Sequence, residues 1–152
     1  MGSYHAKIGE VLQPKIVSTI RGLFSRYPIL VSYLFGSQAT QKANPNSDYD
    51  FAIMLSPKVL PVRYSYYKLR LITDLLRTVN TEFLDLVILN DPKTPLLLKF
   101  NIIKEGAIIY EKDKRQREIL ETDILLEWYD QQYFEHLWCT HFTKNLAQGK
   151  II

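Results

Sequence analysis

Two aspartates separated by one residue stand where the chain could bind a divalent metal ion. Asp48 and Asp50 lie at the start of the β-rich run 49–55. In a strand, residues i and i+2 project to the same side. Two adjacent carboxylates repel each other unless a cation neutralises them, and Mg²⁺ prefers such oxygen ligands while it keeps substrate phosphates in its remaining positions. The alternative is a solvated turn in which Asp48 serves as the cap.

A third aspartate, Asp85, is embedded in the apolar run 83–89. A charge in a buried strand is costly without a partner or a metal ion. If this strand lies beside the strand of Asp50, Asp85 completes a cluster of three carboxylates. Such a cluster holds two metal ions, which activate an attacking oxygen and stabilise a leaving phosphate. The alternative is an edge strand from which Asp85 faces the solvent.

A Gly-Ser pair follows the apolar run 29–35 and precedes a short helical pattern at 37–40. Gly36 allows the backbone to turn tightly against a bulky ligand, and the hydroxyl of Ser37 and the free N–H groups of a helix start bind phosphate oxygens. The pair therefore suits a phosphate-binding turn. Alone it is a weak signal, because a Gly-Ser pair is usually an ordinary turn.

Other residues with chemical potential give weaker signals. His136 and His141 are five residues apart and do not share a helical face as an i, i+4 pair would, and His5 lies near the start of the chain. Cys139 is the only cysteine and has no Lys or Arg nearby to lower its pKa. These residues are interpreted as surface or interface positions. No Gly-rich phosphate loop of the Walker type is present.

The elements that must position these residues follow from the apolar periodicity. Apolar residues at helical spacing predict a helix within 7–24 that begins or kinks at Pro14, and further helices at 64–79, 94–104 and 114–146. Strands are predicted at 29–35, 49–55, 83–89 and 107–110. Because helices alternate with strands, the fold class is α/β, with a mixed sheet of about four strands flanked by helices and a long C-terminal helical segment.

Length and composition fit one globular domain over residues 1–152. The 152 residues are 47% hydrophobic and 23% charged, and the longest apolar runs are far shorter than the ~20 residues of a membrane span. No export signal opens the chain, so a cytoplasmic protein is expected. Lys and Arg outnumber Asp and Glu by 14 to 9 in residues 1–112, whereas the acids lead by 7 to 5 in residues 113–152. This balance is too modest to indicate direct nucleic-acid binding.

The spacing of the Gly-Ser pair, the Asp-x-Asp pair and the later aspartate resembles that of a known family, the MNT-type minimal nucleotidyltransferases of the DNA polymerase β-like superfamily. The motif residues are Gly36-Ser37, Ser47-Asp48-Tyr49-Asp50 and Leu84-Asp85. The resemblance covers residues 15–112, with 113–152 as an extension. Many members carry Arg where this chain has Thr40, and the loop 41–46 also differs from the commoner Gly-containing form.

The resemblance implies roles for these residues. Asp48, Asp50 and Asp85 would be the catalytic residues and the ligands of two Mg²⁺ ions, with Asp85 receiving the acceptor proton. Gly36 and Ser37, assisted by Ser47, would hold the phosphates of ATP.

Within that family, the chain closely resembles the antitoxins of HEPN/MNT toxin–antitoxin pairs. It implies transfer of AMP from ATP to a protein hydroxyl, a tyrosine of a HEPN ribonuclease toxin, which silences that partner. Two alternatives stay open: a non-catalytic antitoxin that acts by binding, and a small-molecule nucleotidyltransferase. The three aspartates favour catalysis, because a pure binding protein has no need of them.

The C-terminal segment 115–146 carries more apolar residues than one helical stripe needs, among them Phe134 and Trp138. In one interpretation the helix wraps the body and both of its flanks are buried. In the other, one flank packs on the body while the other, rimmed by acids, binds another chain. That chain would be the HEPN partner or, without it, a second copy in a homodimer.

Overall fold

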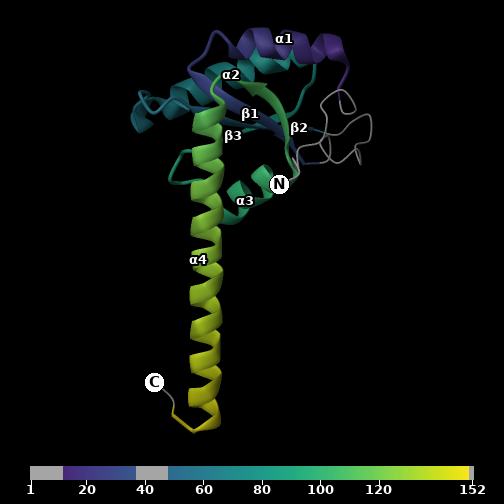
Figure 1. The fold of residues 1–152 in the computed structure, drawn as a ribbon. Helices are drawn as coiled ribbons and strands as arrows, with labels where there is room; N and C mark the ends of the chain where they lie inside the picture. Colours follow the sequence, from purple (N-terminus) through teal and green to yellow (C-terminus); the bar gives the residue numbers. More distant parts are fainter. Residues whose placement is uncertain (1–11, 37–47, 151–152) are drawn as a thin grey trace.

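The computed structural model describes residues 12–36 and 48–150 (Figure 1). In order along the chain, its elements are α1 (Pro14–Phe24), β1 (Ile29–Phe35), β2 (Tyr49–Leu55), η2 (Pro61–Arg63), α2 (Tyr64–Val79), β3 (Leu84–Ile88), α3 (Leu96–Glu105), β4 (Ala107–Glu111) and α4 (Lys114–Ala147). The predicted α/β class is confirmed. The short helix predicted at 37–40 lies outside the described residues.

The four strands form one mixed sheet in the order β3-β2-β1-β4. The central strand β1 pairs antiparallel with β2 and with β4, whereas β2 pairs parallel with β3. Strands β1 and β2 are almost continuously apolar because both faces of the sheet are covered. Because β2 and β3 are parallel, these two strands begin side by side at the same end of the sheet.

Helices cover the sheet on both sides. On one face, α2 packs against β3 and α1 packs against β4, and Ile20, Phe24 and Leu71 of these helices join the sheet residues in one apolar cluster. On the other face, Ile102 of α3 joins Tyr33 and other sheet residues in a second apolar cluster. Because both faces of the sheet are covered, a ligand can reach the sheet only at the ends of its strands.

The element boundaries follow local chemistry. Pro14 stands at the first position of α1, where its missing N–H costs nothing. Asn80 ends α2 in the left-handed conformation, with φ of 53°. The strand predicted at 83–89 spans 84–88, and the helix predicted at 94–104 spans 96–105 because Pro95 is extended, with ψ of 137°, and serves as its N-cap.

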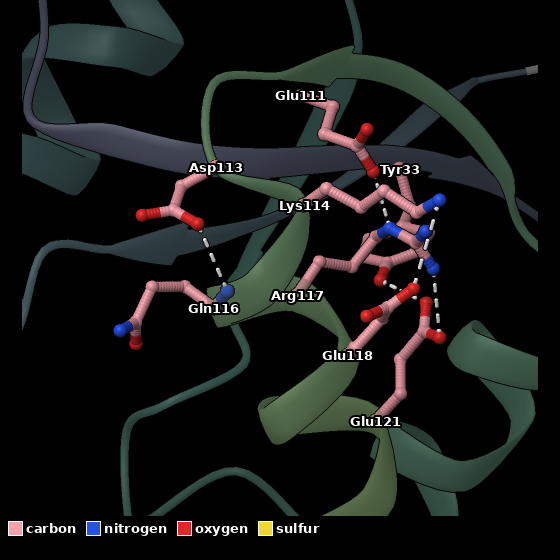
Figure 2. A network of polar contacts seen from close by, with 8 residues as sticks. All are labelled: Tyr33, Glu111, Asp113, Lys114, Gln116, Arg117, Glu118 and Glu121. Carbon is pink, nitrogen blue, oxygen red and sulfur yellow. Dashed lines mark hydrogen bonds and ion pairs between the residues drawn. The ribbon is translucent and has the colours of Figure 1, made fainter.

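A polar network fixes the base of α4 to the sheet (Figure 2). The hydroxyl of Tyr33 on β1 donates to Glu121 Oε1 at 2.6 Å, and Arg117 Nη1 donates to Glu121 Oε2 at 2.9 Å. Arg117 also binds Glu111 at the end of β4 through its Nε. The side chain of Asp113 caps the helix by accepting from the N–H of Gln116 at 3.1 Å. The first turns of α4 are thus tied to two strands.

Beyond its base, α4 leaves the body of the protein (Figure 1). Ile124 is its last buried residue, and the ring of Trp128 stacks on Phe100 of α3 with centroids 4.7 Å apart. From residue 129 to residue 147 every side chain is exposed except the half-buried Asn145. The interpretation in which this helix wraps the body with both flanks buried is therefore wrong. In the described residues no helix is long and apolar enough to cross a membrane.

Candidate active site

Parallel pairing places two of the predicted aspartates side by side. In the register of β2 and β3, Asp50 lies directly opposite Asp85. Asp85 is exposed on the edge strand, Asp50 is half-buried, and Asp48 is exposed just before β2 begins. Adjacent strands are separated by about 4.8 Å, so the backbones of Asp50 and Asp85 stand at the distance that a shared site requires.

The carboxyl of Asp50 is influenced by the two other aspartates. Burial raises the pKa of the Asp50 carboxyl above its usual range, and the negative charges of Asp85 and then Asp48 raise it further. Each of these causes disfavours the ionised form of Asp50. A cation bound between the carboxylates would relieve the repulsion, which is the electrostatic condition of a metal site.

Gly36 contacts this site through its backbone. It follows β1, whose last residue, Phe35, pairs with Asp50, and its φ is +73°. A Cβ atom at this position would lie 2.3 Å from Oδ2 of Asp50. Only glycine fits here, because any side chain would be strained and would displace the carboxylate. This contact was not predicted from the sequence. Antiparallel pairing of the strands 29–35 and 49–55 could have indicated it, because such pairing brings the end of β1 next to the start of β2.

The three carboxylates suit a hard divalent cation by their chemistry. Their side chains do not converge on a single point, however: within the described ranges no three His, Cys, Asp or Glu side chains are grouped closely enough to hold one ion. Asp85 accepts a hydrogen bond at Oδ1 from the N–H of Leu86 at 2.8 Å, which turns this oxygen toward its own strand. The chemistry of the carboxylates and the pairing of Asp50 with Asp85 are compatible with a divalent ion, whereas the side-chain positions in this structure do not form its ligand shell.

The remaining candidate residues fall into two groups. Ser37, Ser47 and His5 lie outside the described residues. His136, His141 and Cys139 lie on the exposed far part of α4, away from the aspartates. These three residues of α4 therefore take no part in the aspartate site.

Two surface cavities in the described part of the chain do not coincide with the aspartates. One of about 500 Å³ lies along β4 and is lined by Arg21 and the residues from Ile108 to Glu111. The other, of about 270 Å³, lies at the opposite end of β3 and is lined by Lys68, Val87, Ile88, Asp91, Lys93, Thr94, Pro95 and Leu98. The candidate site is therefore defined by the paired strands that carry Asp50 and Asp85 and not by these cavities.

Comparison with known proteins agrees with this assignment of the fold. The model of the family described as "Polymerase beta, Nucleotidyltransferase" matches residues 18–115, which is more than half of the chain. No curated protein has a matching sequence.

Several solved structures share the fold at low sequence identity. One is a toxin–antitoxin with AMP-PNP, with a TM-score of 0.66, 17% identity, and coverage of 84% of this chain and 98% of the other. A toxin–antitoxin MntA-HepT structure has a TM-score of 0.63 and 16% identity over 86% and 99% of the two chains. The complex of a tri-AMPylated Shewanella oneidensis HEPN toxin with an MNT antitoxin gives 0.63 and 16% over 87% and 99%.

Proposed function

The chain belongs to the polymerase β nucleotidyltransferase family, and from this premise we propose that it transfers AMP from ATP to a hydroxyl group of a HEPN-type toxin, for which it is the antitoxin. The observation that carries the proposal is the register that sets Asp50 opposite Asp85, with Gly36 against the Asp50 carboxylate. The expected acceptor is a tyrosine of that toxin.

The aspartates have distinct roles in this proposal. Asp48 and Asp50 would hold two Mg²⁺ ions, and Asp85 would be a ligand of one of them. When bound, the ions neutralise charge on the triphosphate and on the attacking oxygen. Gly36 gives the backbone a close approach at the end of β1, where, with Ser37 and Ser47, it would hold the β- and γ-phosphates.

The reaction is a displacement at the α-phosphorus of ATP. The acceptor oxygen forms a bond to this phosphorus, the bond between the α-phosphorus and the oxygen bridging to the β-phosphate breaks, and pyrophosphate leaves. Asp85 receives the proton of the acceptor hydroxyl. Because Asp85 is exposed on an edge strand, it contacts both an incoming protein and the water that finally takes the proton.

Support for the acceptor comes from the structural neighbours. They include a toxin–antitoxin with AMP-PNP and a HEPN toxin that carries AMP groups in complex with an MNT antitoxin. The accessibility of Asp85 agrees with a macromolecular acceptor, since a protein hydroxyl must reach the site from outside.

The proposal is tested with ATP labelled at the α-phosphate, Mg²⁺ and a HEPN partner identified from the neighbouring gene. We expect label on the partner with the wild-type protein and a loss of about 1,000-fold in rate with Asp50→Asn or Asp85→Asn. The matched control is Asp123→Asn, an exposed carboxylate of α4. Wild-type rates in both site variants, or label that never reaches the partner, would contradict the proposal.

A further inference from the structure

The part of α4 beyond Trp128, residues 129–147 and here called the distal segment, exposes apolar side chains around most of its circumference. At about 100° per residue these side chains cover about 260° of the helix, and Leu146 lies opposite Leu137. The exposed apolar residues are Tyr129, Tyr133, Phe134, Leu137, Trp138, Phe142 and Leu146. A helix that is apolar on most of its sides is normally buried, whereas packing against one neighbour needs a stripe of ~100°. The distal segment therefore fits a groove that encloses it on at least two sides.

The carboxylates of the distal segment lie among these apolar side chains. Around the helix, Asp130 stands at nearly the same angle as Leu137, and Glu135 at nearly the same angle as Leu146. Covering either side therefore brings a carboxylate into the contact, and a buried carboxylate is costly unless a cation faces it. Residues 118–147 contain six acids, a single Lys and no Arg. A second copy of this helix could not supply the cations, so the groove belongs to a partner with a cationic surface.

The helix and the aspartates lie on the same face of the sheet. Side chains alternate along a strand, so Asp50 projects to the same side as Ala52 and Met54. These two residues belong to the apolar cluster against which Leu120 of α4 packs. Asp85 shares this face, because it lies opposite Asp50 in the parallel register. A protein bound along the distal segment, which projects past α3 on this face, is therefore on the side to which the carboxylates point (Figure 1).

We propose that the distal segment is the docking element for the protein that receives AMP, and that it lies in a cationic groove of that protein. This inference rests on the proposed function, in which the acceptor is a HEPN-type ribonuclease toxin. A ribonuclease binds RNA phosphates through Lys and Arg side chains, so its surface supplies the cations that Asp130 and Glu135 require. Docking keeps the acceptor hydroxyl at a high effective concentration near Asp85.

The first test measures binding of the full-length protein to the toxin from the neighbouring gene, by calorimetry without ATP. We expect Trp138→Ala, which removes a ring that is 72% exposed in the isolated chain, to raise the dissociation constant about 30-fold. That loss is typical of a central aromatic residue in an interface. The control is Leu69→Ala, which truncates a side chain that is 70% exposed on α2 and should leave the dissociation constant unchanged.

A second test distinguishes enclosure from contact on one side. Leu137→Ala and Leu146→Ala remove side chains of equal size from opposite sides of the helix, where they are 45% and 52% exposed. In an enclosing groove each substitution should raise the dissociation constant by about 5–10-fold. If either substitution has no effect, the partner contacts a single side and the enclosing groove is wrong.

Charge reversal tests the cationic nature of the groove. Asp130→Lys and Glu135→Lys should each weaken binding at least about 10-fold, because each sets like charges against one another in the contact. Thr73→Lys, which adds a positive charge on the exposed side of α2, controls for the change in net charge and should bind like the wild type. Equal binding of all three variants would overturn the cationic groove.

Transfer kinetics separate this inference from the proposed reaction. Trp138→Ala should raise the toxin concentration that gives the half-maximal rate and leave the maximal rate close to that of the wild type, whereas Asp50→Asn lowers the maximal rate. If the wild type labels the toxin and Trp138→Ala does so with unchanged half-saturation, the docking inference is wrong and the reaction stands. If the toxin binds through Trp138 but never receives label, the reaction is wrong and the docking inference stands. A homodimer that Trp138→Ala dissociates would assign the segment to a second copy and overturn the proposal.

Discussion

At the scale of single residues, the most informative side chain is Asp50. Its residue is half-buried and lies opposite Asp85 in a parallel strand pair. Gly36 lies so close to its carboxylate that a side chain at position 36 would not fit. Burial and the neighbouring charges raise its pKa, so the folded protein tolerates the ionised form poorly. Perturbed pKa values of this kind are common at functional sites, although structural ion pairs also cause them.

The raised pKa of Asp50 determines how stability depends on pH. A pKa above the unfolded value gives a contribution that is fully present below the unfolded pKa of 3.8 and is lost as the pH rises through the folded pKa. We therefore expect Asp50→Asn to be slightly more stable than wild type at pH 7, by less than about 1 kcal/mol after solvent screening, and the difference to vanish near pH 4. Urea unfolding at both values measures it.

The same variant separates metal binding from folding. Mg²⁺ should raise the melting temperature of the wild-type protein and leave that of Asp50→Asn unchanged, because a ligand that binds only the folded state stabilises it by mass action. A variant less stable than wild type at pH 7, or one that Mg²⁺ stabilises equally, would show that Asp50 has a purely structural role.

The sequence could predict which residue types gather here, but only part of their geometry. Asp48 and Asp50 could be proposed as neighbours because residues i and i+2 at the start of a strand project to the same side. The position of Asp85 opposite Asp50 depends on which strands pair, and no local pattern fixes that. The exposure of Asp85 follows from β3 being an edge strand, which the sequence left open.

At the scale of elements, the attachment of α4 to the sheet depends on polar groups rather than on apolar area alone. Tyr33 comes from the central strand, and burial together with the charge and hydrogen bond of Glu121 raises its pKa, which keeps the hydroxyl a neutral donor. Arg117 forms ion pairs with Glu111 at the end of β4 and with Glu121 one turn further along α4. A buried network of this kind orients the helix as well as holding it.

We expect Tyr33→Phe to lower the free energy of unfolding by about 1–2 kcal/mol, because it removes a donor to a partly buried carboxylate. Denaturant unfolding measures the loss. The matched control is Tyr129→Phe, which deletes the hydroxyl of an exposed ring on α4 and should change stability by less than about 0.5 kcal/mol. Equal effects of the two substitutions would show that the network does not contribute.

The helices and strands themselves were largely predictable, and this network was not. Continuous apolar runs mark β1 and β2 because both of their faces are covered, and i, i+4 periodicity marks α2 over its full length. The network joins residues of three elements, β1, β4 and α4. Arg117 and Glu121 are an i, i+4 pair within α4, but the contacts of Glu121 with Tyr33 and of Arg117 with Glu111 are products of the tertiary fold and leave no local signal.

At the scale of the whole molecule, the chain consists of a compact α/β body and a helix that runs on past it (Figure 1). The apolar excess of the C-terminal segment indicated either burial or an interface, and the exposure of its rings decides against burial. The contacts of α4 with the body reach as far as the stacking of Trp128 on Phe100. The body should therefore fold without the exposed residues 129–147.

A chain shortened to residues 1–130 tests this separation. It retains Trp128 and the whole polar network, so we expect its melting temperature at low protein concentration to lie within about 2 °C of the full-length value. Circular dichroism measures both the transition and the loss of helix signal. A large fall in melting temperature would mean that the distal segment contributes to the fold of the body.

The attachment of α4 at one end also makes it a lever. The distal segment of 19 residues extends about 28 Å beyond Trp128 at 1.5 Å per residue. A tilt of about 10° about Trp128, where the contacts with the body end, would move its tip by roughly 5 Å. A molecule bound at the tip would therefore be displaced by a small change in how α4 packs on the sheet, whose far edge strand carries Asp85.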